Sequence, residues 1–226
     1  MTVQNTVLNL RLNIVRIVIL ILTILFSQNI MASSLKMNYS LFFGYMKTMY
    51  KLDYQHVTTD FYLVEQSSGE QCFIEQAEIV VDQKREPIEF EKLGKLMPFY
   101  SDEHRKDGAM IDVKTVNNEA CALQVTLMAK ESELNKLSFQ RLLLISSELE
   151  GVLRKNAGMI GKYFLPTYVG LRFKLVTPLA SDFALPSGYV VAPNGDLLVS
   201  NETLMAEQSS QLLAYKVARI SPWIGE

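Results

Sequence analysis

Apolar residues recur with helical spacing between residues 41 and 51 (LFFGYMKTMYK). Leu41, Tyr45 and Met49 fall on one face of such a helix, and apolar residues occupy the adjoining face as well. A helix that is apolar nearly all round has to be covered by its own domain or by a partner. We therefore predict a helix over residues 41–51 that packs in the core or binds another molecule.

Residues 60–128 alternate between apolar and polar, which is typical of half-buried strands. Segments 61–65 and 71–81 flank the turn-rich tetrapeptide SSGE, and this arrangement predicts a β-hairpin. A second hairpin is predicted from segments 110–114 and 120–128.

The stretch 138–156 has the period of an amphipathic helix, with Ser138 at the capping position and Gly158 where a left-handed C-cap is expected. Its apolar stripe consists of Leu142, Ile145, Leu149, Val152 and Leu153. We expect this stripe to pack against a sheet.

A further alternating segment covers residues 168–176, and the tail contains Asn194-Gly195, the strongest short hairpin signal. The predicted fold class is therefore α+β: a mainly antiparallel, sandwich-like β-sheet with two packed helices, roughly residues 41–51 and 138–156.

The chain divides into four predicted segments. Residues 1–32 form a signal peptide, and residues 33–176 form the main β-rich domain with its two helices. Residues 177–187 form a connector, and residues 188–226 form a small C-terminal β extension. An extension of this size rarely holds a core alone, so we expect it to dock on the main domain.

The predicted signal peptide has a basic end, an apolar run at residues 17–26 and a cleavage site between Ala32 and Ser33. The run is about half of the roughly 20 residues that a membrane-spanning helix needs. We therefore expect cleavage and export to the periplasm, with no membrane span left in the mature protein.

The charge of the chain argues against a nucleic-acid partner. The leader carries two of the 22 basic residues and no acidic one, so 20 basic and 24 acidic residues remain after cleavage, a net charge near −4. A nucleic-acid-binding surface needs clustered Lys and Arg, which the sequence does not show.

The two cysteines, Cys72 and Cys121, stand 49 residues apart in strand-like segments. Redox and zinc motifs place cysteines within a few residues of each other, so this spacing favours a structural disulfide in an oxidising compartment. Two buried free thiols and a catalytic thiol are the alternatives. A bond between them would join the two predicted hairpins.

Candidate catalytic residues are few. His56 precedes the first predicted strand and His104 lies in a charged segment, while no G-x-S-x-G elbow occurs. The S-x-x-K spacing appears once, from Ser33 to Lys36, at a chain end that is usually loose. No catalytic residue is assigned, and a small periplasmic hydrolase stays an alternative.

The sequence signals for metal and cofactor binding are similarly weak. Asp102, Glu103, His104 and Asp107 lack the spacing of zinc or calcium motifs, so we interpret them as a solvated charged turn. Methionines such as Met46 are more typical of core packing than of copper binding. No metal ligand or cofactor-binding residue is assigned, no cofactor is expected, and a metal-handling protein is the second alternative.

Several segments together resemble the domain of unknown function 2987 family of Gram-negative envelope proteins. The matching segments are YSLFFGYMK from Tyr39, SGEQCFIEQAEIV from Ser68, LMPF from Leu96, ACAL around Cys121 and GMIGKYFLPTYVGL from Gly158. The family usually has an aspartate after the Pro-Phe pair, where this chain has Tyr100. The resemblance implies an exported, two-cysteine domain, and the family has no established activity to carry over.

We interpret the chain as an exported envelope protein, most consistent with a non-catalytic binding or structural module whose partner is an envelope protein or ligand. Three candidate contact surfaces stand out: the helix at 41–51, the turn Pro98-Phe99-Tyr100 and the end Pro222-Trp223-Ile224. Each of them is equally consistent with packing inside the protein itself.

Overall fold

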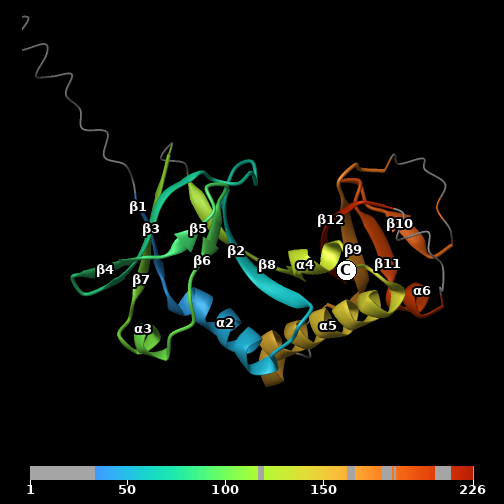
Figure 1. Cartoon of the computed structure of the whole chain (residues 1–226), viewed down its shortest axis with the longest axis horizontal. Coiled ribbons are helices and arrows are strands. Elements are labelled where there is room, and N and C mark those ends of the chain that lie inside the picture. Colours follow the sequence, from blue (N-terminus) through green and yellow to red (C-terminus); the bar gives the residue numbers. More distant parts are fainter. Residues whose placement is uncertain are drawn as a thin grey trace, which may run out of the picture. The chain divides into compact units, whose positions relative to one another are not determined.

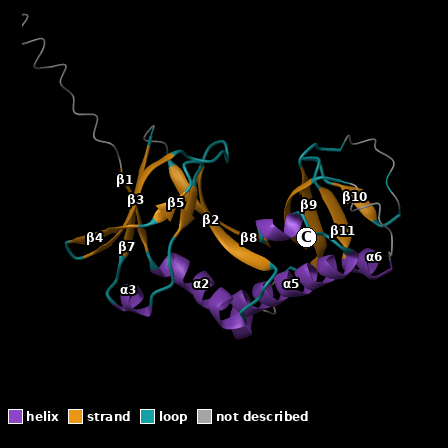
Figure 2. Cartoon of the chain, in the orientation of Figure 1, coloured by secondary structure: helices purple, strands orange, loops and turns teal. Residues whose placement is uncertain are grey.

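The computed structural model describes residues 34–116, 120–161, 166–179, 185, 187–206 and 215–225, without the side chains of 159–161. These residues form three four-stranded antiparallel sheets and five helices, labelled in Figure 1 and coloured by type in Figure 2. The predicted α+β class is confirmed. The predicted leader and its cleavage site at Ala32 and Ser33 lie outside the described residues, as does most of the predicted connector 177–187.

The first sheet has the strand order β1-β7-β3-β4. Its strands are β1 (Ser34–Asn38), β7 (Met110–Thr115), β3 (Ile74–Val81) and β4 (Lys84–Pro87). Strand β1 begins one residue after the predicted mature end and pairs with β7 from Ser34↔Lys114 to Asn38↔Met110. The expectation of a loose chain end was wrong from Ser34 onward, because Met37 of β1 is buried in the core.

The second sheet has the order β5-β6-β2-β8. Its strands are β5 (Glu89–Phe90), β6 (Lys95–Met97), β2 (Val57–Glu65) and β8 (Cys121–Ala129). β2 and β8 pair over nine residues, from Val57↔Ala129 to Glu65↔Cys121. Residues of both sheets share one hydrophobic core, which includes Phe61, Leu63, Ile79, Leu96, Ile111 and Val113.

Both predicted hairpins were wrong in their pairing, although the strands themselves form. β2 and β3 lie in different sheets and share only the isolated bridge Val64↔Gln71, and β7 and β8 are likewise in different sheets. Alternation requires only that each strand turn its apolar face to a core. Here that core lies between two sheets, so the chain crosses from one sheet to the other after β2 and again after β7.

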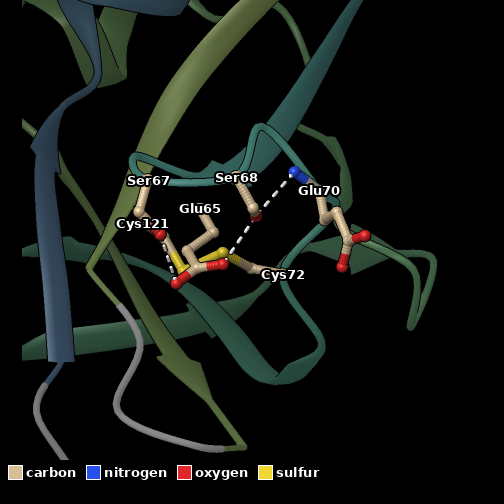
Figure 3. Close-up of a disulfide and its surroundings, with 6 residues drawn as sticks. All are labelled: Glu65, Ser67, Ser68, Glu70, Cys72 and Cys121. Atoms are coloured by element: carbon tan, nitrogen blue, oxygen red, sulfur yellow. Dashed lines mark hydrogen bonds between the residues drawn. A yellow bond between two sulfur atoms is a disulfide. The ribbon is translucent and has the colours of Figure 1, made fainter.

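The Cys72–Cys121 disulfide is present, with the two Cα atoms 6.5 Å apart (Figure 3). It joins the connection between β2 and β3 to the first residue of β8, rather than two hairpins. Cys72 is fully buried and Cys121 is nearly so. Beside it, the Glu65 carboxylate accepts hydrogen bonds from the Ser67 and Ser68 hydroxyls at 2.8 and 2.6 Å, which orders the SSGE turn.

The third sheet has the order β10-β11-β9-β12. Its strands are β10 (Tyr189–Val191), β11 (Leu197–Ser200), β9 (Tyr168–Leu175) and β12 (Val217–Ile224), with the short helix α6 (Asn201–Ala206) after β11. The predicted Asn-Gly hairpin is confirmed: Gly195 has a positive φ of 81°, and the Ala192 N–H donates to the Asp196 carbonyl at 2.8 Å.

Helices α2 (Ser40–Leu52) and α5 (Phe139–Gly161) confirm the two predicted helices. Ser138 caps α5 by accepting from the Arg141 N–H at 3.2 Å, and Gly158 has a φ of 69°. Four residues of the predicted stripe are buried in a second core with β9, β11 and β12: Leu142, Ile145, Leu149 and Val152. Two shorter helices complete the set, α3 (Asp102–Lys106) and α4 (Glu131–Leu134).

Candidate functional site

Tyr39, the residue before α2, fixes a distant turn against that helix. Its side chain is fully buried, and its hydroxyl donates to the Phe99 carbonyl at 2.7 Å and accepts from the Ser101 N–H at 2.9 Å. Burial raises the pKa of this hydroxyl above its ordinary value of 10.0, so it remains a donor at neutral pH. The Pro98-Phe99-Tyr100 turn is thereby held beside a helix that lies 60 residues earlier in the chain.

Three aromatic rings then form a continuous pile, which we call the aromatic stack: Phe43, Tyr100 and Tyr50. Phe43 and Tyr50 are seven residues apart on α2, or about 10 Å along a helix axis. Tyr100 lies between them, with centroids 5.1 Å from each ring and interplanar angles of 20° and 13°. Tyr50 is 72% exposed, so one face of the stack is open to solvent.

Two cations lie at the Phe43 end of the aromatic stack. The Lys47 Nζ lies 5.5 Å and the Arg105 Cζ 5.0 Å from the centroid of Phe43. Cations at this distance are attracted by the electron-rich ring face. Neither side chain forms an ion pair within the described part of the chain. Their positive charges are therefore available to a ligand.

The charged segment with His104 forms α3, not the open turn that we predicted. Ser101 caps this helix by accepting from the His104 N–H at 3.1 Å. The His104 ring lies 5.1 Å from Phe99 and 5.9 Å from Tyr39, and its buried Nδ1 has no hydrogen-bond partner among the described residues. A cavity of about 160 Å³ adjoins it, lined by Ile79, Val81, Lys84, Glu86, Glu103, His104 and Asp107.

Metal ligation finds no support in the residues that the structure describes. No three His, Cys, Asp or Glu side chains there converge as a metal site would require, and Asp102 instead accepts a hydrogen bond from the Tyr100 hydroxyl at 3.0 Å. Met46 packs against the first core and Met49 against the second. Both methionines therefore have packing roles in α2.

His56 belongs to a buried charge cluster at the start of β2. Its Nδ1 lies 3.0 Å from the carboxylate of Glu133, which is 7% exposed and also binds the Arg141 guanidinium at 2.5 Å. Burial by itself would raise the pKa of Glu133, but the hydrogen bonds from Arg141 and His56 outweigh it and lower that pKa. Glu148 accepts the His56 backbone N–H at 2.8 Å, so the cluster ties β2, α4 and α5 together.

The third predicted contact surface, Pro222-Trp223-Ile224, is far from the other two in sequence and belongs to the third sheet. Pro222 and Trp223 are in β12, opposite Leu171 and Gly170 of β9. Ile224 borders a cavity of about 260 Å³, lined with it by Glu150, Leu153, Arg154, Pro166, Thr167 and Tyr168.

Tyr168 lies in a polar network beside this cavity. Its hydroxyl is 2.9 Å from the buried Ser146 hydroxyl, which donates to Asn201 at 2.6 Å. Burial raises the pKa of Tyr168 to about 12. Glu150 and Arg154, the two charged residues among the described lining residues, form an ion pair with each other.

The structure thus brings two of the three predicted contact surfaces together, α2 and the Pro98-Phe99-Tyr100 turn. Sequence reasoning missed the stack itself and the two cations beside it. The aromatic pair at i and i+7 on α2 is the signal that could have indicated a ring inserted between them. Of the S-x-x-K match, Ser33 lies outside the described residues and Lys36 is in β1.

The fold and the site define a disulfide-bonded α+β protein with a stack of aromatic rings that ends at the exposed Tyr50. The chain belongs to the DUF2987 family, described as a protein of unknown function, whose family model matches residues 31–175. This confirms the family resemblance found in the sequence. The match ends at the last residue of β9, so β10, β11, α6 and β12 follow the matched region. No curated protein and no solved structure matches the chain.

Among the described residues, no helix has both the length and the apolar character needed to cross a membrane.

Proposed function

We propose that this protein is an exported envelope protein that acts as a non-catalytic binding module, with the aromatic stack as its binding surface. The observation that carries this proposal is Tyr50, which is held flat on Tyr100 and is nevertheless 72% exposed. Large aromatic side chains dominate binding energetics when a partner covers them.

The surface is ordered before any ligand arrives, which supports a binding role. Tyr39 anchors the turn by two hydrogen bonds, and the turn in turn places Tyr100 between two residues of α2. A preorganised surface loses little conformational entropy on binding. Leu41, at 52% exposure, and Phe99, at 45%, add apolar area on the same two elements.

The environments of the two histidines favour binding over hydrolysis. The His56 ring is bonded to Glu133, and the His104 ring lies between Phe99 and Tyr39. Each ring thus has a role in packing or charge pairing. A hydrolase of the Ser-His type requires a hydroxyl bonded to the histidine ring, and within the described residues His56 Nδ1 bonds to Glu133 instead while His104 Nδ1 has no partner.

Export is supported by the leader and by the disulfide. The leader has the composition of a signal peptide, and the Cys72–Cys121 bond is compatible with an oxidising compartment. Cleavage at Ala32 would leave Ser33 directly before β1, so the mature chain would begin at the edge of the first sheet.

Fractionation of a Gram-negative host that expresses the full chain tests the proposal. We expect the protein in the envelope with its leader removed after Ala32, and we expect Tyr50→Ala to shift it from the wall and membrane pellet to the soluble periplasm. Met205→Ala is the matched control, because Met205 is 71% exposed but lies on α6. A protein that stays in the cytoplasm with Met1 and free thiols would refute export. Identical fractionation of all three proteins would refute the binding surface.

A further inference from the structure

We propose that one face of the third sheet docks on a membrane surface that carries anionic phospholipids. The face is the one turned away from the core, on the paired strands β9 and β12 (Figure 1). It contains Arg172 and Lys174 of β9 together with Arg219 and Trp223 of β12, and we call it the basic face. It shares no residue with the aromatic stack, so the two claims can fail separately.

Strand pairing places the three cations on the same side of the sheet. Residues two apart on a strand share a face, and so do residues paired directly across two strands. Arg172 and Lys174 are two residues apart, and Lys174 is paired with Arg219. The alternate residues of β9, Leu171 and Phe173, are fully buried in the core. The three cations therefore point away from that core.

The described part of the chain leaves these cations without partners. None of the three forms an ion pair there, and the buried Nε atoms of Arg172 and Arg219 have no hydrogen-bond acceptor. Like charges paired across two strands destabilise a sheet, and a guanidinium without an acceptor is costly. An anion bound at this face would remove both costs.

Acidic groups from neighbouring segments do not neutralise the basic face. Asp196, directly before β11, is 6% exposed and accepts a hydrogen bond from Asn194 at 2.9 Å. Helix α4 contacts β12, but its Glu133 belongs to the buried cluster with His56, and its Glu131 forms no ion pair among the described residues. Because the whole chain has a net charge of −2, the basic face is a local reversal of its charge.

The form of the face indicates an extended partner rather than a small molecule. Small ligands bind in cavities that enclose most of their surface. Neither of the two cavities described above is lined by a residue of the basic face. The partner therefore has to present its negative charge on a surface of its own.

Apolar groups beside the cations distinguish a bilayer from a dense polyanion. Trp223 is paired with Gly170 and so lies on the same side of the sheet as Arg172. Val190, which is 49% exposed, reaches that side through its pairing with Leu198. Tryptophan and basic residues together are typical of a membrane–water interface, where anionic headgroups offer phosphate oxygens to guanidinium groups. A polyanion would instead need a continuous basic track.

Fluorescence of Trp223, the single tryptophan of the chain, reports binding at the basic face directly. The exported protein is titrated in low salt with vesicles of phosphatidylcholine and phosphatidylglycerol, and with matched vesicles of phosphatidylcholine alone. We expect the emission to move to shorter wavelength with the anionic vesicles, and we expect at least about tenfold tighter binding to them. High salt should abolish this preference, because the charges are exposed to screening.

Variants assign the binding to the cations. Lys174→Gln with Arg219→Gln should weaken binding to the anionic vesicles at least about tenfold. Lys36→Gln with Lys84→Gln is the matched control, because it removes two charges from exposed positions of the first sheet and should leave binding unchanged. Tyr50→Ala should also bind as the parent does. Circular dichroism confirms that each variant is folded.

Several outcomes would overturn the inference. Equal binding to both kinds of vesicle, or unchanged binding after loss of Lys174 and Arg219, would refute the basic face as a membrane contact. A Trp223 response to pyrophosphate or to polyglutamate without one to vesicles would assign the face to a soluble phosphate or to an acidic protein instead. Loss of vesicle binding in Tyr50→Ala alone would move the contact to the aromatic stack. Envelope fractionation in high salt, where the basic face does not hold a membrane, still tests the proposed function by itself.

Discussion

At the scale of single residues, buried polar groups hold together segments that the sequence pattern treats as independent. Tyr39 fixes the turn at Phe99, and Glu133 joins His56 to Arg141. Neither role could be predicted from one sequence, because Phe99 lies 60 residues from Tyr39, His56 lies 77 residues from Glu133, and hydrogen bonding leaves no periodic pattern.

The first prediction concerns Glu133. Glu133→Gln should lower the free energy of unfolding at pH 7 by about 1–3 kcal/mol, because it leaves Arg141 and His56 without their buried carboxylate. The matched control is Glu131→Gln, an exposed position in the same helix α4. Thermal denaturation of both variants and of the parent measures the difference.

The pH dependence of that difference has a definite sign. The folded-state pKa of Glu133 lies below its ordinary value of 4.5, so its contribution is fully present above pH 4.5 and is lost as the pH falls through the folded value. Parent and Glu133→Gln should therefore converge in stability in strong acid. If the difference in unfolding free energy between parent and variant stayed constant down to the folded-state pKa, the role given to the Glu133 carboxylate would be contradicted.

At the scale of elements, the sequence predicted which segments are helices and strands far better than which strands pair. Helices α2 and α5 and the Asn194-Gly195 hairpin depend on local signals, namely period, caps and turn residues. The two wrong hairpins depended on the assumption that consecutive strands pair. The strand β1 was missed because Leu35 and Met37 give too short an alternation to stand out beside a leader.

In the candidate site, too, the sequence indicated the segments but not how they come together. Sequence reasoning selected the apolar helix α2 and the Pro98-Phe99-Tyr100 turn as two separate candidate surfaces. Their meeting depends on the path of β6 and on Tyr39, which are tertiary features. The third selected surface, around Ile224, follows a different strand and borders a different cavity.

The second prediction concerns the Cys72–Cys121 disulfide. Replacing both Cys72 and Cys121 with Ala should lower the free energy of unfolding by roughly 4 kcal/mol, the chain-entropy value for a loop of about 50 residues. Chemical denaturation measures it, with the exported parent as the comparison. In the denatured parent, a thiol titration should find no reactive group. Two titratable thiols would contradict the bond.

At the scale of the whole molecule, two cores are joined by shared elements. The β2–β8 pair contributes Phe61 and Leu63 to the first core, while Val57 and Ala129 at its other end belong to the second. Helix α2 likewise buries Phe42 in the first core and packs Met49 against the second. The described residues from Ser34 onward form one compact unit for this reason.

The third prediction concerns the C-terminal extension, residues 188–226. Strand β9 pairs on one side with β11 and on the other with β12, and both lie in the extension. Removing the extension exposes Leu171 and Phe173, which are fully buried in the intact protein. We expect the shortened chain to aggregate or to lose its cooperative unfolding transition, as measured by light scattering and circular dichroism. A monomer with an unchanged melting temperature would show that the extension is only an appendage.

The central claim is that ligand binding occurs at the aromatic stack, and NMR of the mature protein with ring-labelled tyrosine tests it most directly. On addition of a detergent extract of the Gram-negative envelope, the ring signals of Tyr50 and Tyr100 should shift together, while Tyr168 beside the other cavity should not move. Tyr50→Ala should abolish the shift at Tyr100. Signals that stay in place at Tyr50 and Tyr100, or a shift confined to Tyr168, would contradict the claim.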